Sequence, residues 1–419
     1  MNGNITKEDK LYLRELAIKY KEYSELDIMK ERTVNWYSHN QLKSEKPLIV
    51  MEKDSFNDFL PEPKCSTDSG KYIENILINE ILNYELINDD KVIPPYFPVD
   101  MEINIKSFAK GYEHTYSKDS EGREIGYESK HIIKNLEEDL PGLLHSVYSF
   151  DLEQTNARKE CVEEVLGDIL PVVLKNTSLH WHVTPTAQII ELMGMEAMMF
   201  AMFDTPEEML RLFSFIKDDI IGYVKWQEEE GLLTLNNGND YAGAGSYGFT
   251  SELPGSSFQN EKHITTKDLW VNMNSQESVG ISPDMFGEFI FPSYRDLAEE
   301  FGMLYYGCCE PVHDVWEDYI SKLPNLRKVS ISPWCHEKRM GEYLKGSEVI
   351  YSRKPSPNFI GIGKNLNEET FSKHILETLE AAKGNTLEFI FRDIYNLEGN
   401  IGKPGRAVEI VRELIDSNW

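Results

Sequence analysis

The 419-residue sequence is short of the features that mark several classes of protein. It has only five cysteines, which excludes a disulfide framework and is typical of a reducing compartment. No run of lysine or arginine offsets the formal net charge of −28, so we expect neither nucleic-acid nor membrane binding. The longest apolar stretch, 189–203, carries two glutamates and is shorter than the roughly 20 residues that span a bilayer. The polar N-terminus lacks the apolar core of a signal peptide, and we expect a cytoplasmic protein.

The composition that remains is that of a folded globule, with 41% hydrophobic and 27% charged residues. Short apolar runs alternate with segments of helical periodicity, most clearly after residue 160. This alternation predicts an α/β protein with a (β/α)8 TIM barrel. An open doubly wound sheet is the alternative, although its G-x-G-x-x-G fingerprint is absent. The eight strands that we expect are 47–51, 170–174, 232–238, 269–276, 304–309, 328–332, 348–355 and 387–394.

The whole chain, 1–419, is expected to form a single domain. Residues 1–45 have helical spacing and would form an N-terminal helical extension that caps one end of the barrel. Residues 53–160 have a mixed pattern and are interpreted as an insertion or cap region. The glycine-rich segment GAGSYG (243–248) lacks a strand-then-helix frame, so we expect a flexible loop rather than a phosphate site.

The densest group of reactive side chains is YYGCCEPVHD, 305–314, directly after an apolar strand. Thiolate, imidazole and carboxylate are the ligands of zinc, so Cys308, Glu310 and His313 are candidate ligands. Strand alternation would place Tyr306, Cys308 and Glu310 on one face. Cys335 follows the next strand, where its loop would lie beside that of Cys308. Alternatively, these cysteines are small buried hydrophobic groups or free thiols in loops.

Other candidates also lie near predicted strand ends. His180 and His182 would point the same way in an extended chain, as a metal pair or a substrate clamp would, unless one simply packs on the tryptophan between them. Lys354 and Arg392 are candidates to hold a carboxylate or phosphate. Asp393 either contributes to that site or pairs with Arg392 to seal the barrel top. We expect His182, Cys308, Cys335, Lys354 and Arg392 to converge on one cavity, because parallel strands end on one face of a barrel.

Several motifs resemble the uroporphyrinogen decarboxylase superfamily. PTAQIIELMGMEAMMFAMFDTPEEMLRLFSFI (185–216) is similar to the family segment with a Pro-Thr start, a Leu-x-Gly turn and an Asp-x-Pro-Glu before a long helix. SPDMFGEFIFPSYRDLAEEFG (282–302) resembles its Ser-Pro-led helix, and RTVNWYSHNQLKSEKPLIV (32–50) resembles its opening helix and strand. The resemblance implies a (β/α)8 barrel, in agreement with the strand pattern.

The resemblance is nearer to the zinc-dependent methyltransferase branch, which moves methyl groups between a corrinoid protein and a thiol or folate. Its zinc pattern resembles His-x-Cys plus a distant Cys. Here Cys308 matches the middle ligand, Tyr306 stands in place of the histidine, and Arg392-Asp393 stands in place of the last cysteine. Glu310, His313 or Cys335 would then complete the set. The decarboxylase branch carries an Arg-Gln-Ala-Gly-Arg motif after its first strand, and nothing like it follows the strand at 47–51.

The sequence therefore predicts a methyltransferase that takes its methylcobamide from a partner corrinoid protein, or from another small-molecule donor, possibly with zinc. Glu310, His182 and Arg392 are the expected catalytic residues. His180, Tyr306, Lys354 and Asp393 are expected to bind substrate, and Cys308, His313 and Cys335 to bind the metal. The alternatives are a decarboxylase that relies on Lys354 and Arg392 as cations, and a non-enzymatic accessory protein that binds a corrinoid or a metal.

Overall fold

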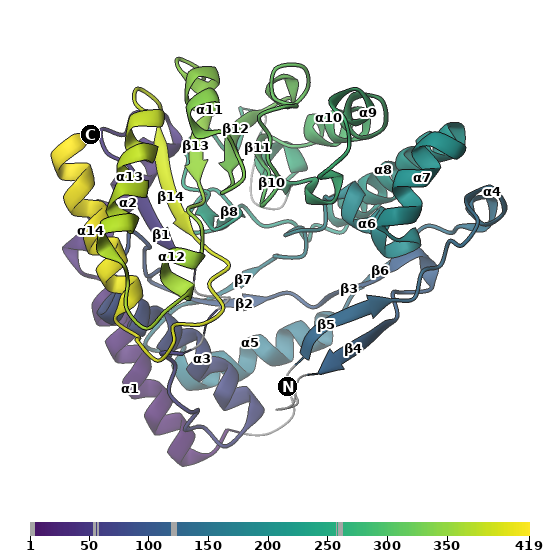
Figure 1. The fold of residues 1–419 in the computed structure, drawn as a ribbon. Coiled ribbons are helices and arrows are strands. Elements are labelled where there is room, and N and C mark those ends of the chain that lie inside the picture. The colour runs from purple at the N-terminus through teal and green to yellow at the C-terminus, as the bar shows by residue number, and fades with distance from the viewer. Residues whose placement is uncertain (1–4, 53–55, 57, 119–123, 257, 259–262) are drawn as a thin grey trace.

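The structure, a computed structural model, describes residues 5–52, 56, 58–118, 124–256, 258 and 263–419. The chain folds as a mixed α/β protein around a parallel sheet of six strands (Figure 1). Every neighbouring pair in this sheet runs parallel, and most of its residues are buried. The strands lie in the order β1 (Leu48–Met51), β14 (Leu387–Phe391), β13 (Ile350–Arg353), β12 (Leu326–Ile331), β11 (Met303–Tyr306) and β10 (Trp270–Met273).

Helices return the chain between these strands and cover the outer face of the sheet (Figure 1). The predicted helix over 282–302 begins as its sequence indicates. The Ser282 hydroxyl accepts a hydrogen bond from the backbone N–H of Met285 at 3.3 Å, and Pro283 occupies the first helical position. The helices on this face include α10 (Phe291–Glu299), α11 (Glu337–Leu344), α13 (Glu368–Ala381) and α14 (Lys403–Asn418). The short helix α9 (Pro283–Met285) precedes α10, α8 (Pro206–Glu229) packs against α10, and α12 (Asn358–Gly361) packs against α14.

Six of the eight predicted strands belong to this sheet, and the other two differ from the prediction. The run at 170–174 becomes β7 (Val172–Lys175), which pairs in parallel with β2 (Phe97–Asp100) in a separate sheet. The region 53–160 therefore supplies one parallel strand, β2. The run at 232–238 is not a strand. Its Asn236 side chain donates to the Trp270 carbonyl at 3.0 Å and accepts from the Trp270 N–H at 2.9 Å.

The N-terminal extension forms two helices, α1 (Lys7–Ser24) and α2 (Asp27–Asn40). Together with α3 (Asp68–Leu82) and α5 (Leu152–Leu166) they enclose a second apolar core against β2 and β7 (Figure 1). The polar stretch 117–130 has the composition of a surface hairpin or loop. On either side of residues 119–123, which lie outside the described residues, β4 (His114–Lys118) and β5 (Glu124–Ser129) pair antiparallel. The remaining elements are β3 (Ile103–Lys106), β6 (Val147–Phe150), α4 (Leu136–Asp139), α6 (Pro185–Met193) and α7 (Met195–Asp204). Short turns are η1 (Asn83–Ile87), η2 (Ser107–Ala109), η3 (Leu140–Gly142), η4 (Thr266–Asp268), η5 (Gln276–Ser278), η6 (Phe286–Ile290) and η7 (Ile320–Lys322).

The apolar stretch 189–203 is divided between α6 and α7, which meet at an angle of 96°. Gly194 stands at the bend with φ of +85°, a conformation that favours glycine. Among the described residues, no single helix has the length and apolar character needed to cross a membrane, and only this bent pair passes that test together.

The glycine-rich segment is not the flexible loop that its composition predicts. It forms a short hairpin, β8 (Tyr241–Gly243) and β9 (Ser246–Tyr247), which packs against β10 and β11. Ala242, Ala244 and Ser246 are each at most 3% exposed. A Cβ atom on Gly245 would lie 2.4 Å from Cγ2 of Ile390, so only glycine fits so close to β14. The hairpin therefore occupies buried space next to strands β10, β11 and β14.

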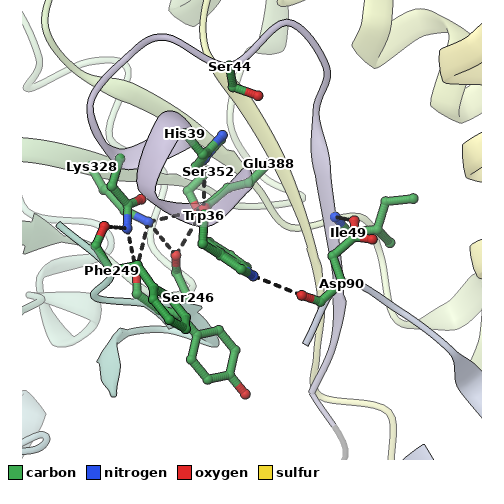
Figure 2. Close-up of polar contacts among 12 residues, drawn as sticks. Trp36, His39, Ser44, Ile49, Asp90, Ser246, Phe249, Lys328, Ser352 and Glu388 are labelled. Atoms are coloured by element: carbon green, nitrogen blue, oxygen red, sulfur yellow. Dashed lines mark hydrogen bonds and ion pairs between the residues drawn. The ribbon is translucent and has the colours of Figure 1, made fainter. Parts of the chain in front are cut away.

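A buried network of charged and polar groups fixes this hairpin in place (Figure 2). The Lys328 ammonium on β12 lies 3.2 Å from the Glu388 carboxylate on β14 and donates to the Ser246 hydroxyl at 2.6 Å. His39 on α2 places its Nε2 3.1 Å from Glu388. Burial lowers the pKa of His39, so the neutral ring donates from Nε2 to the carboxylate. Burial also lowers the pKa of Lys328, although Glu388 opposes that shift.

Removing the charge of Glu388 tests this network. Glu388→Gln leaves the Lys328 ammonium without its counter-charge in a site that water does not reach. We expect the free energy of unfolding to fall by about 3–5 kcal/mol, measured by urea denaturation followed by circular dichroism. The matched control is Asp416→Asn, which breaks the exposed ion pair of Asp416 with Lys46 and should leave the urea midpoint unchanged. Unaltered stability of Glu388→Gln would contradict the structural role of the network.

Candidate active site

Two cavities lie beside the carboxyl ends of β1, β2 and β7. The larger has a volume of about 580 Å³ and is lined by α1, α3, the ends of β2 and β7, and the segment 234–247. The smaller, of about 430 Å³, is lined by β1, α3 and the same hairpin. Both are lined by Ile76, Glu80, Tyr241 and Tyr247, so they adjoin each other. The carboxyl ends of parallel strands are where α/β proteins bind their ligands.

A buried ion pair stands at the edge of the smaller cavity. Glu52, which follows β1 and lines that cavity, lies 3.1 Å from Nε of Arg392, which follows β14. The Tyr241 hydroxyl donates to Glu52 at 3.3 Å. The Arg392 guanidinium also lies 5.5 Å from the centre of the Trp181 ring, which is 37% exposed. Burial alone would lower the pKa of Arg392, but Glu52 and other negatively charged neighbours raise it, so the guanidinium stays charged.

Two adjacent cysteines lie next to this arginine. The Sγ atoms of Cys308 and Cys309 are 3.4 Å apart, and Sγ of Cys309 lies 3.5 Å from Oδ2 of Asp393. The hydrogen bond from the Cys308 thiol, followed by the positive charge of Arg392, lowers the pKa of Cys309 against the effect of burial. The same hydrogen bond raises the pKa of Cys308, with burial adding to the shift. The Cys309 thiol also donates to Asp393, so the pair is polarised in its pKa values, with that of Cys309 lowered and that of Cys308 raised.

Glu310 fixes the backbone of the turn that carries Cys308 and Cys309. The buried Glu310 carboxylate accepts the backbone N–H of Ser275 and that of Cys308, each at 2.9 Å. Gly307 has φ of +95°, and a Cβ there would lie 3.1 Å from Cβ of Ser330. Burial raises the pKa of Glu310 although these backbone donors lower it. The Glu310 oxygens are engaged by the backbone and hold Cys308 in position, and its expected catalytic role stays a prediction.

Lys354 lies deeper in the interior, at the end of β13. Its ammonium donates to the Ser352 hydroxyl at 2.7 Å and contacts the Tyr305 hydroxyl. Burial lowers its pKa to about 7, which neighbouring Arg392 reinforces and the negative charge of Glu388 opposes. Lys354 is only 2% exposed, so its expected role in binding substrate directly is not supported by its position.

Three of the five residues expected to converge on one cavity are close to one another, although the linings of the two cavities include none of the three. Cys308, Lys354 and Arg392 are electrostatic neighbours. Cys335 instead lies in the apolar core, where its sulfur accepts the Val312 N–H at 3.5 Å. His182 packs its ring 4.6 Å from that of Tyr223, and burial lowers its pKa to about 4.

The expected zinc ligands are not gathered into one site. His313 accepts the backbone N–H of His336 at 3.4 Å and lies 3.6 Å from Asp314, away from the thiol pair. Within the part of the chain that the structure describes, no group of three or more His, Cys, Asp or Glu side chains could hold a metal ion. The set Cys308, His313 and Cys335 therefore does not fit zinc as these residues are placed.

Two further expectations fail because the backbone is not extended where alternation was assumed. Trp181 has φ of +61°, so His180 and His182 diverge rather than face the same way. His180 lies 5.2 Å from the Tyr241 ring and lines the larger cavity, as a substrate-binding residue would. On β11 it is Tyr305 that faces Ser352 and Lys354. Tyr306 faces the other way, bonds the Ser275 hydroxyl at 2.7 Å and belongs to the core. Its expected role in substrate binding stays a prediction.

The sequence interpretation missed Glu52, Trp181, Tyr241 and the second thiol, Cys309. Glu52 is the first residue after a predicted strand, a position that the same reasoning would have selected. Tyr241 carries no such signal, because it reaches the site only through the inward hairpin. Asp393, expected to bind substrate, lies against both Cys309 and Arg392.

Comparison with known proteins adds little to this description. No family model matches the chain, and no curated protein matches it. Among solved structures it is similar to a methyltransferase from Methanosarcina mazei, with 12% sequence identity and a TM-score of 0.49 over 90% of this chain and 98% of that one.

The polarised thiol pair makes a prediction about reactivity. Because its pKa is lowered, Cys309 should be alkylated by iodoacetamide at lower pH than Cys161, a partly exposed cysteine whose pKa burial raises. The pH profile of each site can be followed by mass spectrometry of peptides. Cys308→Ala removes the donated hydrogen bond and should move the Cys309 profile to higher pH, whereas Cys335→Ala should leave it in place. Coincident profiles for Cys309 and Cys161 would refute the polarised pair.

Proposed function

We propose that this protein is a methyltransferase that transfers a methyl group from a corrinoid-bound donor to a thiol acceptor. The observation that carries the proposal is the Cys308–Cys309 pair, whose sulfurs are 3.4 Å apart beside a buried arginine at the carboxyl ends of β11 and β14. The resemblance of 185–216 and 282–302 to the uroporphyrinogen decarboxylase superfamily, and of Cys308 to the middle zinc ligand of its methyltransferase branch, supports it. Membership of that superfamily and closure of the sheet into a (β/α)8 barrel are part of the same proposal.

Methyl transfer to a thiol requires the acceptor to be deprotonated, because the thiolate is the nucleophile. In our proposal Cys309 is the general base that takes the proton from the acceptor thiol. The acceptor sulfur then attacks the methyl carbon and forms the carbon–sulfur bond. The carbon–cobalt bond of the donor breaks with both electrons remaining on cobalt. Cys309 finally returns its proton to solvent, so the chain ends the cycle unchanged.

The neighbours of Cys309 support this role. Arg392 and the Cys308 S–H favour the thiolate form before the acceptor binds. Asp393 opposes it, since its negative charge raises the pKa of Cys309 and keeps the thiolate basic enough to accept a proton. A base whose pKa lies near that of the acceptor thiol transfers protons efficiently in both directions.

The donor side of the proposal rests on the exposed aromatic residues beside the thiol pair. Trp181 is 37% exposed and stacks near Arg392, and Tyr395 is 76% exposed. Burial and the negative charges of Asp393 and Cys309 raise the pKa of Tyr395, which places its ring close to the thiols. Exposed flat aromatic rings near the thiols suit the planar macrocycle of a methylcobamide carried by a partner protein. No step is assigned to zinc, because the residues expected to bind it are apart.

Decarboxylation of a carboxylate substrate receives less support from the same geometry. It would rely on Lys354 and Arg392 to stabilise developing negative charge. Arg392 is already paired with Glu52, and Lys354 is buried against Ser352 and Tyr305. Each cation therefore already has a partner that would compete with a substrate carboxylate.

Turnover with methylcobalamin tests the proposal. Anaerobic incubation with 2-mercaptoethanol should produce the methyl thioether and cob(I)alamin, followed by absorbance and mass spectrometry. Loss of the general base in Cys309→Ala should lower kcat by about 10²–10⁴-fold. Cys335→Ala is the matched control, since that thiol lies in the apolar core, and it should turn over at close to the wild-type rate.

Two results would overturn the proposal. One is wild-type turnover of methylcobalamin that Cys309→Ala leaves unchanged. The other is conversion of uroporphyrinogen to coproporphyrinogen without any methyl transfer, which would favour the decarboxylase alternative.

A further inference from the structure

The proposed proton transfer needs one thiol and does not explain why two stand together. The Sγ atoms of Cys308 and Cys309 are 3.4 Å apart. A disulfide bond has a sulfur–sulfur distance of about 2.05 Å, so a further approach of about 1.4 Å would join them. Cys335 is not available to either thiol in this way, because its sulfur lies in the apolar core against the Val312 N–H. The two adjacent cysteines are therefore placed to react with each other.

The two thiols differ in their access to a small oxidant. Cys309 is partly exposed, whereas Cys308 is only 4% exposed. The hydrogen bond from Cys308 and the charge of Arg392 lower the pKa of Cys309, which favours the reactive thiolate. Cysteines that respond to oxidants combine such exposure and low pKa with a second thiol beside them. Cys309 thus has the properties of the attacking thiol, and Cys308 those of the resolving thiol.

Buried side chains hold the two sulfurs at this distance. The Cys308 N–H donates to the Glu310 carboxylate at 2.9 Å, and the Cys308 carbonyl accepts the Ser330 hydroxyl at 2.6 Å. Glu310 is 4% exposed and Ser330 is fully buried. Both polar groups of the Cys308 backbone are therefore fixed from the interior. The contact between the thiols belongs to the folded turn and does not depend on a mobile surface loop.

We propose that Cys308 and Cys309 form a reversible disulfide when the protein meets a peroxide. The Cys309 thiolate attacks one oxygen of hydrogen peroxide, the oxygen–oxygen bond breaks, and Cys309 becomes a sulfenic acid. The hydroxide that leaves combines with the proton that Cys309 had released. The Cys308 sulfur then attacks the Cys309 sulfur, and its proton leaves with the sulfenic oxygen as a second water. Two thiols lose two electrons, and the peroxide is reduced to water.

A disulfide between adjacent residues is also easy to reopen. Neighbouring Cα atoms are about 3.8 Å apart, which is below the roughly 4.4–6.8 Å that an unstrained disulfide spans. Strain of this kind makes the bond more reducible, as in regulatory disulfides rather than structural ones. We therefore expect the pair to be open in the presence of excess thiol and to close when a peroxide is added.

The consequence for activity rests on the proposed function. In the disulfide Cys309 has no thiolate to accept the proton of the acceptor, so the closed form should not transfer methyl groups. Cob(I)alamin, the product of the proposed transfer, is itself readily oxidised. Closing the pair would therefore stop the transfer under the conditions in which the corrinoid is also lost.

Mass spectrometry of the full chain tests the disulfide without a corrinoid or an acceptor thiol. The protein is treated with hydrogen peroxide, free thiols are blocked with N-ethylmaleimide, and tryptic peptides are analysed. Peptide 296–322 contains both cysteines and no other. We expect it to lose two hydrogen atoms about 10-fold faster than Cys161, the other partly exposed cysteine, is oxidised. Dithiothreitol should restore both thiols.

Variants assign the two steps. Cys308→Ser removes the resolving thiol, so oxidation should stop at a Cys309 sulfenic acid that dimedone traps. Cys309→Ser leaves only the buried thiol, which should react about 10-fold more slowly than the wild-type pair. Cys161→Ser is the matched control, because it removes the other partly exposed thiol and should leave closure of the pair unchanged.

Turnover tests the consequence separately. Protein closed with peroxide and then freed of it should begin to methylate 2-mercaptoethanol only after a lag, since the acceptor must first reduce the bond. Reduction with dithiothreitol beforehand should remove the lag.

Three results would overturn the inference. They are a wild-type peptide that gains oxygen without forming the bond, a disulfide that joins Cys309 to a different cysteine, and immediate turnover by fully closed protein. A pair that closes and reopens in a protein that never demethylates methylcobalamin would refute the proposed function and leave the disulfide standing.

Discussion

The buried contact between Lys328 and Glu388 is the interaction on which the rest of the site depends. Two charges placed out of reach of water must satisfy each other, and each must find further partners for its remaining hydrogen-bonding capacity. The Glu388 carboxylate accepts hydrogen bonds from the Ser246 hydroxyl and the His39 ring, and the Lys328 ammonium donates to the Ser246 hydroxyl. The consequence is that β12 and β14, the N-terminal extension and the glycine-rich hairpin are tied to one point (Figure 2). An apolar pair would fill the same space without specifying which segments meet there.

The position of the hairpin then determines the shape of the site. Because Ser246 is anchored to the network, Tyr241 at the other side of the hairpin is carried to Glu52 and to the wall that the two cavities share. Glu52 in turn orients Arg392, whose charge lowers the pKa of Cys309. Glu310 completes the arrangement from the opposite side by holding the backbone of Cys308. The thiols, the arginine and the tyrosines are thus positioned by buried polar contacts rather than by flexible loops.

Apolar patterning was sufficient to predict six strands of the parallel sheet and the helices between them, since both depend on local periodicity. It also predicted that Cys308, Lys354 and Arg392 would meet, because each follows a strand in one parallel sheet. It failed at 232–238, where the Asn236 side chain replaces the ladder of backbone hydrogen bonds. The prediction also failed around Trp181 and Gly307, where the backbone has a positive φ. A positive φ breaks the alternation of side-chain direction that was used to place His182 and to put Tyr306 on one face with Cys308. The packing of residues 241–247 against the sheet depends on tertiary contacts, and no local sequence pattern predicts it.

The central claim is that Cys309 moves a proton while the methyl group passes directly to the acceptor. The most direct measurement is to locate the label after a single turnover with ¹³C-methyl-labelled methylcobalamin and an excess of 2-mercaptoethanol, by mass spectrometry of both the small molecules and the protein. The account predicts that all of the label appears in the small-molecule thioether, with one cob(I)alamin formed for each methyl group and none on the chain. Label retained on Cys309 or Cys308, or thioether formed at an equal rate by Cys309→Ala, would contradict it.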